Sequence, residues 1–384
     1  MLPTLINNKL VERQLNSNLR ALRSMSDIRA NEITIDGNKL INFTSNDYLS
    51  LSQHPLLKER AIQAIEKYGV GNPSSRLLAG NSELYCQIET QLAQLKGTET
   101  AIIFPTGFQT NLTALHALSK LNSFILCDKL SHNSAILGAQ LNTHRFKRFA
   151  HNDLEDLTRL ILKHGDDNVL VFTESVFSMD GDIAPIKTIQ ELCQTSKSFL
   201  YVDEAHATGL FGKNGMGLVE SPQENTLVMG TFGKGCGSFG AYIACSNQLR
   251  DYLVNFCSGL IYTTALPPPV LASIYAALEL IPQMAPERDR LQKLATRIRD
   301  ELRNIGFQTG QSVSPIISLY LGSSDLALSL SAYLENRNIY ARAIRPPTVP
   351  DNTARIRLSV TLAHTDSDID YLITVLNDWH ANKH

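Results

Sequence analysis

A lysine between two glycines is the residue of this sequence best suited to covalent chemistry. Lys234 lies in TLVMGTFGKGCGSFG, just beyond an apolar run that predicts a strand. A lysine that forms a Schiff base needs a partly buried, accessible site, and the small neighbours leave space beside its amine. An exposed loop lysine is the ordinary alternative. Thr231, three residues earlier, and Asp203 with His206 at the end of another predicted strand weaken that alternative.

Asp203 ends the apolar run FLYVD and is followed three residues later by His206. A carboxylate in such a position is costly to bury without a cationic partner. The pyridinium nitrogen of pyridoxal phosphate is a suitable partner, because a carboxylate keeps that ring protonated and able to accept electrons. A structural ion pair and a metal site are the alternatives, although Asp-x-x-His supplies too few ligands for zinc.

Two further segments follow predicted strands and could contact such a cofactor. Thr106-Gly107-Phe108 opens a predicted helix, whose free N–H groups and dipole could hold a phosphate, while a generic turn is the alternative. His132 follows FILCD and could stack on a planar ring, although a histidine at a capped helix start is commoner. Ligands of open α/β sheets bind at the carboxyl ends of strands, so we expect these segments to converge.

Two other patterns in the sequence resemble binding motifs. Arg355 and Arg357 are two residues apart and point to one face of a predicted strand, where one could grip a substrate carboxylate; surface arginines are commoner. Gly235 to Gly240 matches the dinucleotide pattern G-x-G-x-x-G, which requires a strand before it and a helix after it. A strand is expected to follow here, which argues against a nicotinamide-linked dehydrogenase.

Apolar runs that alternate with helical spacing predict the elements that position these residues. Such alternation predicts a mostly parallel α/β sheet with helices on both faces. Only the last two runs are too close together for a parallel crossover, so we expect them to be antiparallel neighbours. The runs lie at 101–104, 124–128, 169–175, 199–205, 226–232 and 240–246, with helices at about 109–119, 131–141, 153–164 and 185–197.

Composition shifts along the chain predict three domains. Residues 1–50 contain an amphipathic helix from about Leu5 to Met25 and a strand pair that turns at Asp36-Gly37. Residues 51–269 form a large cofactor-binding domain. The segment LPPP at 266–269 leads into a smaller α+β domain over 270–384.

The overall composition limits the partners and the compartment. The 384 residues carry 35 Lys and Arg against 37 Asp and Glu, a formal charge of −2, so nucleic acid is not an expected partner. The cysteines contain no C-x-x-C pair, which favours a reducing compartment without a zinc site. No apolar run approaches the roughly 18 residues of a membrane span, and we expect a cytoplasmic protein with no membrane partner.

Several segments, in this order and spacing, strongly resemble the α-oxoamine synthases. These are fold-type-I pyridoxal-phosphate enzymes that condense an amino acid with an acyl thioester and release carbon dioxide. The resemblance runs along essentially the whole chain and implies a mixed, mostly parallel seven-stranded sheet and a homodimer with the active site at its interface. Its carriers are SNDYLSL (45–51), TESVFSMDGD (173–182), DEAHATG (203–209), TFGKG (231–235), IRPPTVP (344–350) and ARIRL (354–358).

Within that family, the segment RFAHNDLEDL, the IRPPTVP run and the compact length are most similar to the biotin-pathway member. That member joins L-alanine to a pimeloyl thioester, carried by coenzyme A or by an acyl carrier protein. Glycine C-acetyltransferase is the alternative activity. A catalytically silent partner subunit is a further alternative, against which the presence of Lys234 argues.

By matched motif, the resemblance implies how pyridoxal 5′-phosphate would be held. Lys234 would carry it as a covalent aldimine and later move the substrate α-proton. Asp203 would pair with the ring nitrogen, and His132 would stack on the ring. His206 and Ser178 match positions near the ring oxygen. The phosphate would be bound by the N–H groups of Gly107 and Phe108, by Thr231, and by Thr263 or Thr264 of a partner subunit.

The resemblance also implies contacts to the substrates. Asn46 and Arg357 match the groups that receive the amino-acid carboxylate, and Arg23 matches a position near the far carboxylate of the pimeloyl chain. One segment departs from the family, because this chain reads GNPSSR at 71–76 where relatives commonly have a glycine-rich stretch. Proline fixes φ and removes a donor, so we expect a change at the acyl-donor edge rather than at the cofactor.

Overall fold

The structure is a computed structural model that describes residues 2–141, 145–165 and 167–382. They form two compact units: Asp47–Ser178 with Ile183–Asp289 (the large unit), and Met1–Asn46 with Met179–Asp182 and Arg290–His384 (the small unit). The expected boundaries near residues 50 and 269 differ from this division, because the N-terminal strand pair shares a sheet with a strand near residue 340. The three domains stay a prediction about independent folding.

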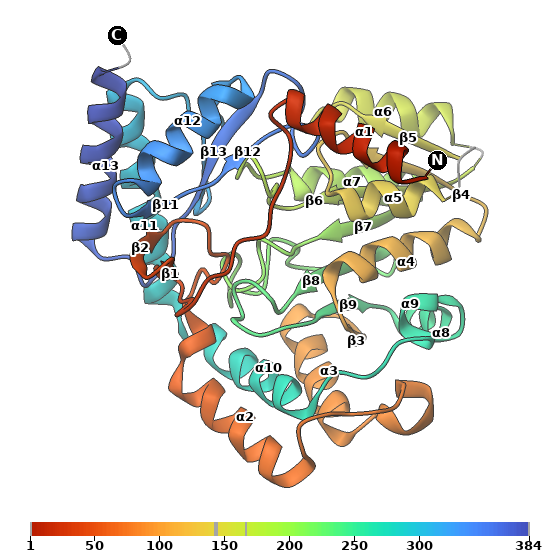
Figure 1. Ribbon diagram of the computed structural model, residues 1–384. Coiled ribbons are helices and arrows are strands. Elements are labelled where there is room, and N and C mark those ends of the chain that lie inside the picture. Colours follow the sequence, from red (N-terminus) through yellow and green to blue (C-terminus); the bar gives the residue numbers. More distant parts are fainter. Residues whose placement is uncertain (1, 142–144, 166, 383–384) are drawn as a thin grey trace. The chain divides into compact units, whose positions relative to one another are not determined.

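The large unit is built on a seven-stranded mixed sheet with the order β3-β9-β8-β7-β6-β4-β5 (Figure 1). Strands β5, β4, β6, β7 and β8 run parallel, whereas β9 is antiparallel to both β8 and β3. This confirms the predicted mostly parallel sheet and its antiparallel last pair. The strands are β3 (Thr100–Phe104), β4 (Ser123–Asp128), β5 (Phe146–Phe149), β6 (Asn168–Glu174), β7 (Phe199–Asp203), β8 (Thr226–Thr231) and β9 (Ala241–Cys245).

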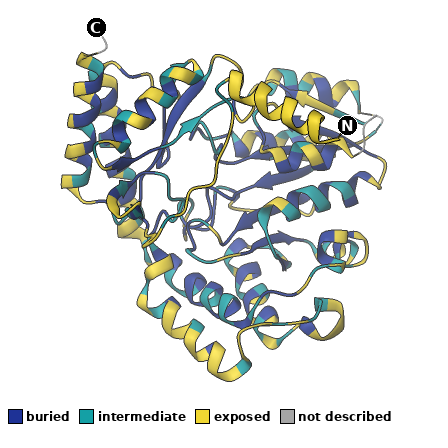
Figure 2. Ribbon diagram, in the orientation of Figure 1, coloured by how far each residue is buried: buried dark blue, intermediate teal, exposed yellow. Residues whose placement is uncertain are grey.

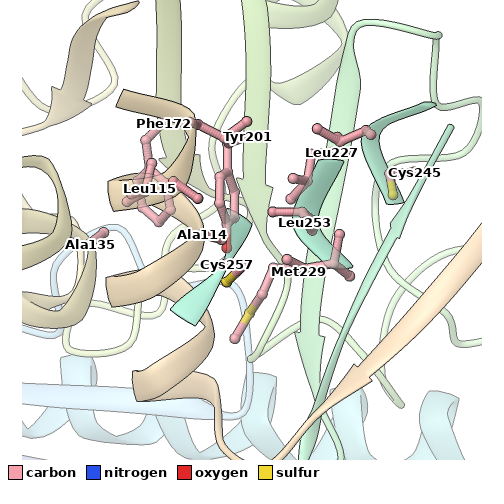
Figure 3. Packing of buried hydrophobic residues seen from close by; sticks show 14 of the residues in the cluster. Ala114, Leu115, Ala135, Phe172, Tyr201, Leu227, Met229, Cys245, Leu253 and Cys257 are labelled. Atoms are coloured by element: carbon pink, nitrogen blue, oxygen red, sulfur yellow. The ribbon is translucent and has the colours of Figure 1, made fainter. Parts of the chain in front are cut away.

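Both faces of this sheet are covered, as its unbroken apolar runs predict. Every residue of β4 and β8 is buried, whichever way its side chain points. On one face, alternate strand residues pack against α4 (Gly107–Ser119), α5 (Asn133–Gln140), α8 (Asn247–Phe256) and α9 (Ser258–Ile261). Figure 3 shows Leu115 of α4 in this layer with Phe172 and Tyr201 of the sheet.

The remaining elements of the large unit include the two other helices expected between strands, α6 and α7. Lys96, at the end of α3, forms a buried ion pair with Glu204 and donates to the carbonyl oxygen of Met216 at 2.5 Å. That pair ties α3 to the turn that follows Asp203. These elements are η1 (Leu51–Gln53), α2 (Pro55–Tyr68), η2 (Arg76–Gly80), α3 (Glu83–Lys96), α6 (Leu154–Lys163), α7 (Ile186–Thr195), α10 (Pro268–Leu280) and η3 (Ile281–Gln283).

The small unit contains two three-stranded sheets, with the orders β1-β2-β11 and β10-β13-β12. The predicted hairpin is present, and its turn residues Asp36 and Gly37 adopt φ angles of 51° and 81°. Helix α11 (Ala285–Ile305) begins in the large unit and continues here. The other elements are α1 (Leu2–Leu15), β1 (Glu32–Ile35), β2 (Asn38–Asn42), β10 (Ile316–Gly322), α12 (Ser324–Glu335), β11 (Ile339–Tyr340), β12 (Ala343–Ile344), β13 (Ala354–Ser359) and α13 (Asp366–Ala381).

The N-terminal helix is shorter than its spacing predicts. Helix α1 ends at Leu15 rather than near Met25, because polar residues follow and Ser17 adopts a φ of 53°, which a right-handed helix does not allow. None of its residues is buried, and the helix is exposed along its length (Figure 2). Leu5 and Leu10 are among its exposed apolar residues. Within the described ranges, no helix combines the length and the apolar character that crossing a bilayer requires.

Candidate active site

A cavity of about 210 Å³ lies at the ends of several strands of the large unit. Its walls come from the residues that end or follow β4, β6, β7 and β8 and from the first two turns of α4. This is the edge at which open α/β sheets bind ligands. The predicted site residues that line it are Gly107, Phe108, His132, Ser178, Asp203, His206, Thr231 and Lys234.

One end of the cavity suits a phosphate. Thr106 caps α4 by accepting a hydrogen bond from the N–H of Gln109 at 3.2 Å, so the helix begins at Gly107 with its N–H groups at the cavity wall. The wall is tight at this point, because a Cβ atom on Gly107 would lie 3.0 Å from Met229 Cε. The hydroxyl of Thr231 lies on the same wall and donates to the carbonyl oxygen of Gly240 at 2.8 Å. Helix N-termini attract anions through these N–H groups and the helix dipole.

Asp203 supplies a buried carboxylate, with only 5% of the residue exposed. Its Oδ1 accepts from the N–H of Ala205 at 2.8 Å, and its Oδ2 accepts from Nδ2 of Asn111 at 2.7 Å. Asn111 is itself oriented by the hydroxyl of Tyr201, which donates to its Oδ1 at 2.8 Å. Among the residues that the structure describes, no ion pair is formed with Asp203. A buried carboxylate that accepts hydrogen bonds from neutral donors only is suited to pair with a cationic ring nitrogen.

Lys234 extends from the loop between β8 and β9 into the cavity. Its Nζ lies 2.8 Å from Nε2 of His206, and Nδ1 of His206 lies 2.7 Å from the hydroxyl of the fully buried Tyr48. Gly235 allows the loop to approach the turn after Asp203, because a Cβ atom there would lie 2.5 Å from the carbonyl oxygen of Thr208. Strand β9 follows this loop, so the sequence from Gly235 lacks the helix of a dinucleotide motif.

His132 both caps a helix and lines the cavity. Its Nδ1 accepts from the N–H of Ser134 at 3.3 Å, at the start of α5. Burial lowers its pKa, an effect that the carboxylate of Asp203 opposes and the ammonium group of Lys234 reinforces. The sequence left a capped helix start and a ring contact as alternatives, and the geometry is compatible with both at once.

Three predicted substrate residues belong to the small unit. Nη2 of Arg357 donates to Oδ1 of Asn46 at 3.2 Å, so the structure brings this predicted pair together. Arg355, on the same strand, instead forms an ion pair with Asp180 at 2.6 Å. Arg23 forms ion pairs with Glu335 at 2.6 Å and with Asp36 at 3.2 Å, and its role toward substrate stays a prediction.

Arg20, three residues before Arg23, lines a small cavity of about 70 Å³ that the sequence did not indicate. Its Nη2 donates to Oγ1 of Thr348 at 2.9 Å. Arg345 lines the same cavity and donates to the carbonyl oxygen of Leu19 at 3.5 Å. Burial and the positive charges of Arg20 and Arg342 lower the pKa of Arg345. Within the described ranges, neither Arg20 nor Arg345 forms an ion pair, so this cavity presents unneutralised positive charge.

Thr263 and Thr264 do not line the cavity described above. Thr264 is exposed and forms a β-bridge with Ser75, within the segment that departs from the family. Arg76 in that segment pairs with Glu89 at 2.7 Å and stacks on the ring of Tyr85. Both threonines therefore stay predicted contacts of a partner subunit.

The chain is similar in sequence to a known protein family and to several named proteins. The family model described as aminotransferase class I and II matches residues 38–376. A protein of Desulfosudis oleivorans, provisionally named 8-amino-7-oxononanoate synthase, is 46% identical over 97% of each chain. The 8-amino-7-oxononanoate synthase of Gluconacetobacter diazotrophicus is 45% identical over 89% of this chain and 88% of its own. The chain belongs to the 8-amino-7-oxononanoate synthase family.

Solved structures place the 8-amino-7-oxononanoate synthase family within a wider fold. A serine palmitoyltransferase (SPT) structure with a PLP internal aldimine has a TM-score of 0.93 and is 28% identical, covering 100% of this chain and 99% of that one. The 8-amino-7-oxononanoate synthase of Francisella tularensis has a TM-score of 0.78 and is 29% identical, and the match covers 90% of this chain and 98% of that one. The predicted fold type of a pyridoxal-phosphate enzyme is confirmed.

The sequence of this member of the 8-amino-7-oxononanoate synthase family did not indicate several residues of its site. Asn111, Ser134 and Glu174 line the main cavity, and Tyr48 contacts His206 from outside it. Glu174 ends the apolar strand β6, and this position is the same sequence signal that marks Asp203 at the end of β7. Asn111 lies inside an ordinary helix, where no local pattern marks it.

Proposed function

We propose that the protein condenses L-alanine with a pimeloyl thioester, using pyridoxal phosphate, to give 8-amino-7-oxononanoate for biotin synthesis. A bond forms between the alanine α-carbon and the thioester carbonyl carbon, the alanine carboxylate leaves as carbon dioxide, and the carrier thiol leaves with a proton. The observation that carries the proposal is the cavity in which Lys234, His206, Asp203 and His132 converge, in a chain of this family. No group of His, Cys, Asp and Glu within the described ranges is suited to hold a metal ion.

The cavity residues fit the cofactor by their chemistry. The carboxylate of Asp203 suits the ring nitrogen, His206 and Ser178 suit the ring oxygen, and the side chain of His132 suits the ring face. The first N–H groups of α4 and Thr231 suit the phosphate. Pyridoxal phosphate, when bound, supplies an electron-accepting ring that stabilises negative charge at the substrate α-carbon.

The chain's own residues then handle the protons and the charges. Lys234 is the base that takes the alanine α-proton and later returns a proton, because its side chain extends a basic amine into the cavity. His206 lies 2.8 Å from that amine and orients it. The Asn46–Arg357 pair supplies a two-pronged donor for the amino-acid carboxylate.

The cavity lined by Arg20, Arg345 and Thr348 suits the far carboxylate of the pimeloyl chain. Guanidinium groups bind carboxylates with paired donors, and no acidic partner in the described part of the chain competes for Arg20 or Arg345. This assignment moves the predicted contact from Arg23 to Arg20. The thioester carrier, coenzyme A or an acyl carrier protein, is left for the experiment to decide.

The proposed enzyme acts as a homodimer in the cytoplasm. Leu78 and Tyr262 are each 84% exposed, and their segments are joined by the hydrogen bond from the N–H of Ala265 to the carbonyl oxygen of Ser74 at 2.9 Å. An exposed apolar surface of this kind supports association with a second copy, and it adjoins the predicted cross-subunit Thr264. The six cysteines are free thiols, which supports a reducing compartment.

The test is to incubate the purified protein with pyridoxal phosphate, alanine labelled in its carboxyl carbon, and either pimeloyl-CoA or pimeloyl-acyl carrier protein. We expect a product with the mass of 8-amino-7-oxononanoate and release of the label as carbon dioxide. Glycine with acetyl-CoA is the matched control and should give little product. Efficient product from that control, with none from alanine, would assign the protein to glycine C-acetyltransferase activity instead.

A further inference from the structure

Glu174 is a buried acid of the cavity for which the proposed reaction has no use. It ends strand β6 with 3% of the residue exposed, and it lines the same cavity as Lys234. In the parallel pairing of β6 with β7, Glu174 lies directly opposite Asp203. Two largely buried carboxyl groups therefore lie on neighbouring strands and line the same cavity.

The two carboxyl oxygens of Glu174 hold two different parts of the cavity wall. Its Oε1 accepts from the main-chain N–H of His132 at 2.5 Å. Its Oε2 accepts from the main-chain N–H of Ser178 at 3.3 Å. His132 belongs to the connection between β4 and α5, whereas Ser178 follows β6 by four residues. One side chain thus links the segments that carry two of the proposed ring contacts.

The surroundings of Glu174 favour its protonated form more than water would. Burial raises its pKa well above the usual value, and the neighbouring carboxylate of Asp203 raises it further. The N–H groups of His132 and Ser178 and the ammonium group of Lys234 act in the opposite direction. Both carboxyl oxygens nevertheless accept main-chain N–H groups, and these hydrogen bonds favour the ionised form and offset part of the cost of burying its charge.

We propose that Glu174 is a positioning residue that clasps the main chains of His132 and Ser178 and so sets their side chains for the cofactor ring. This inference rests on the proposed function, because it assigns pyridoxal phosphate to the cavity. The clasp acts through accepted hydrogen bonds. Both hydrogen bonds are part-buried, and leaving these N–H groups without their acceptor is costly, so their segments should loosen when the carboxyl group is removed.

Two variants separate the clasp from general packing. Glu174→Met keeps a similar volume and removes both acceptors, whereas Glu174→Gln keeps one oxygen for the stronger contact with His132. Thr173→Val is the matched control, because Thr173 is buried on the same strand, points to the opposite face and does not line the cavity.

The first measurement is amide hydrogen exchange at His132 and Ser178 in cofactor-free protein. We expect exchange about tenfold faster in Glu174→Met, equivalent to about 1.4 kcal/mol. In Glu174→Gln the effect should be confined to Ser178, and Thr173→Val should match the wild type. Unchanged exchange at both amides in a folded Glu174→Met or Glu174→Gln protein would overturn the clasp, whatever reaction the enzyme catalyses.

The second measurement is the visible circular dichroism and dissociation constant of bound pyridoxal phosphate. We expect the Kd to rise about tenfold in Glu174→Met, with a weaker dichroic band, and by no more than about threefold in Glu174→Gln. A wild-type Kd and band in Glu174→Met would overturn the link to the cofactor. If the wild-type protein itself failed to bind pyridoxal phosphate, the proposed function would be wrong. The hydrogen-exchange result would still test whether Glu174 holds the two main-chain segments.

Discussion

Three polar side chains that line the cavity of the large unit are each held in place by a second group. His132 accepts at Nδ1 from the main chain of Ser134, which places its proton on Nε2 in the neutral ring. His206 is held at both ring nitrogens, by Tyr48 on one side and Lys234 on the other. Asp203 is oriented by Asn111 through a 2.7 Å hydrogen bond. Such support keeps reactive groups in place before substrate arrives.

Asp203→Asn should separate cofactor binding from turnover. The amide has the same size and can stay beside Asn111, but it carries no negative charge to keep a ring nitrogen protonated. We expect pyridoxal phosphate to bind and kcat to fall by about 10³-fold or more. Absorbance titration measures the binding, and product mass measures the rate. Wild-type turnover in this variant would contradict the assignment of Asp203.

Arg20 and Arg23 give opposite expectations for the far carboxylate of the pimeloyl chain. Arg20→Met removes an unpaired guanidinium from the small cavity, so we expect the KM for pimeloyl thioester to rise at least about tenfold. Arg23→Met removes only exposed ion pairs with Glu335 and Asp36 and should change that KM little. Steady-state kinetics with alanine held constant decide the matter. A larger effect from Arg23→Met would restore the sequence-based assignment.

Secondary-structure elements of the small unit are joined by a buried histidine whose ring is neutral at pH 7. Nε2 of His364 lies 3.1 Å from the carbonyl oxygen of Asn42 at the end of β2, and Nδ1 accepts from the N–H of Thr361 at 3.0 Å. Its ring stacks on the ring of Phe43, with 4.3 Å between the two ring centroids. Burial lowers its pKa from 6.5 to about 4, while Asp368 opposes this change. The neutral ring is the form that joins these elements.

The stability of the protein should therefore fall in mild acid through His364. The unfolded chain binds this proton below about pH 6.5 and the folded chain only below about 4, so this stability is complete above pH 6.5 and is lost as the pH falls toward 4. Between pH 7.5 and pH 5 we expect a loss of about 2 kcal/mol from this residue. Urea unfolding of wild type and His364→Gln at both pH values measures it. An equal pH dependence in the two proteins would contradict the prediction.

At the scale of the whole molecule, two exposed apolar residues lie on the surface that we propose a second copy covers. Leu78 and Tyr262 lie on adjoining segments of the large unit, next to Thr264. The predicted phosphate contact by Thr263 or Thr264 requires a partner, since neither lines the cavity within this chain. Assembly and cofactor binding should for this reason be linked.

Leu78→Asp should shift the protein toward monomer and weaken cofactor binding together. A charge on this surface must be desolvated when a second copy binds, which is costly without a partner. Sedimentation velocity should show a loss of dimer, and the Kd of pyridoxal phosphate should rise about tenfold. Leu162→Asp is the control, because Leu162 is 76% exposed elsewhere, on α6, and should change neither quantity. A dimer that persists in Leu78→Asp would place the interface on another surface.

The order of elements, the mostly parallel sheet and its antiparallel last pair could be predicted from the chain alone. Apolar runs and the spacing between them are local properties, so they survive without knowledge of tertiary contacts. The strand ends that carry Asp203 and Lys234 could be located for the same reason. The end of α1 was misjudged, because helical spacing continues past Leu15 although Ser17 leaves the helical conformation.

The sequence by itself thus determined the large sheet and the polar residues at the ends of its strands, since both follow from patterns among chain neighbours. Only the tertiary structure decided which groups support them. Glu174 contacts His132 across 42 positions, Asn111 contacts Asp203 across 92, and Tyr48 contacts His206 across 158. Contacts over such separations are set by how strands and helices pack, and no local pattern encodes them.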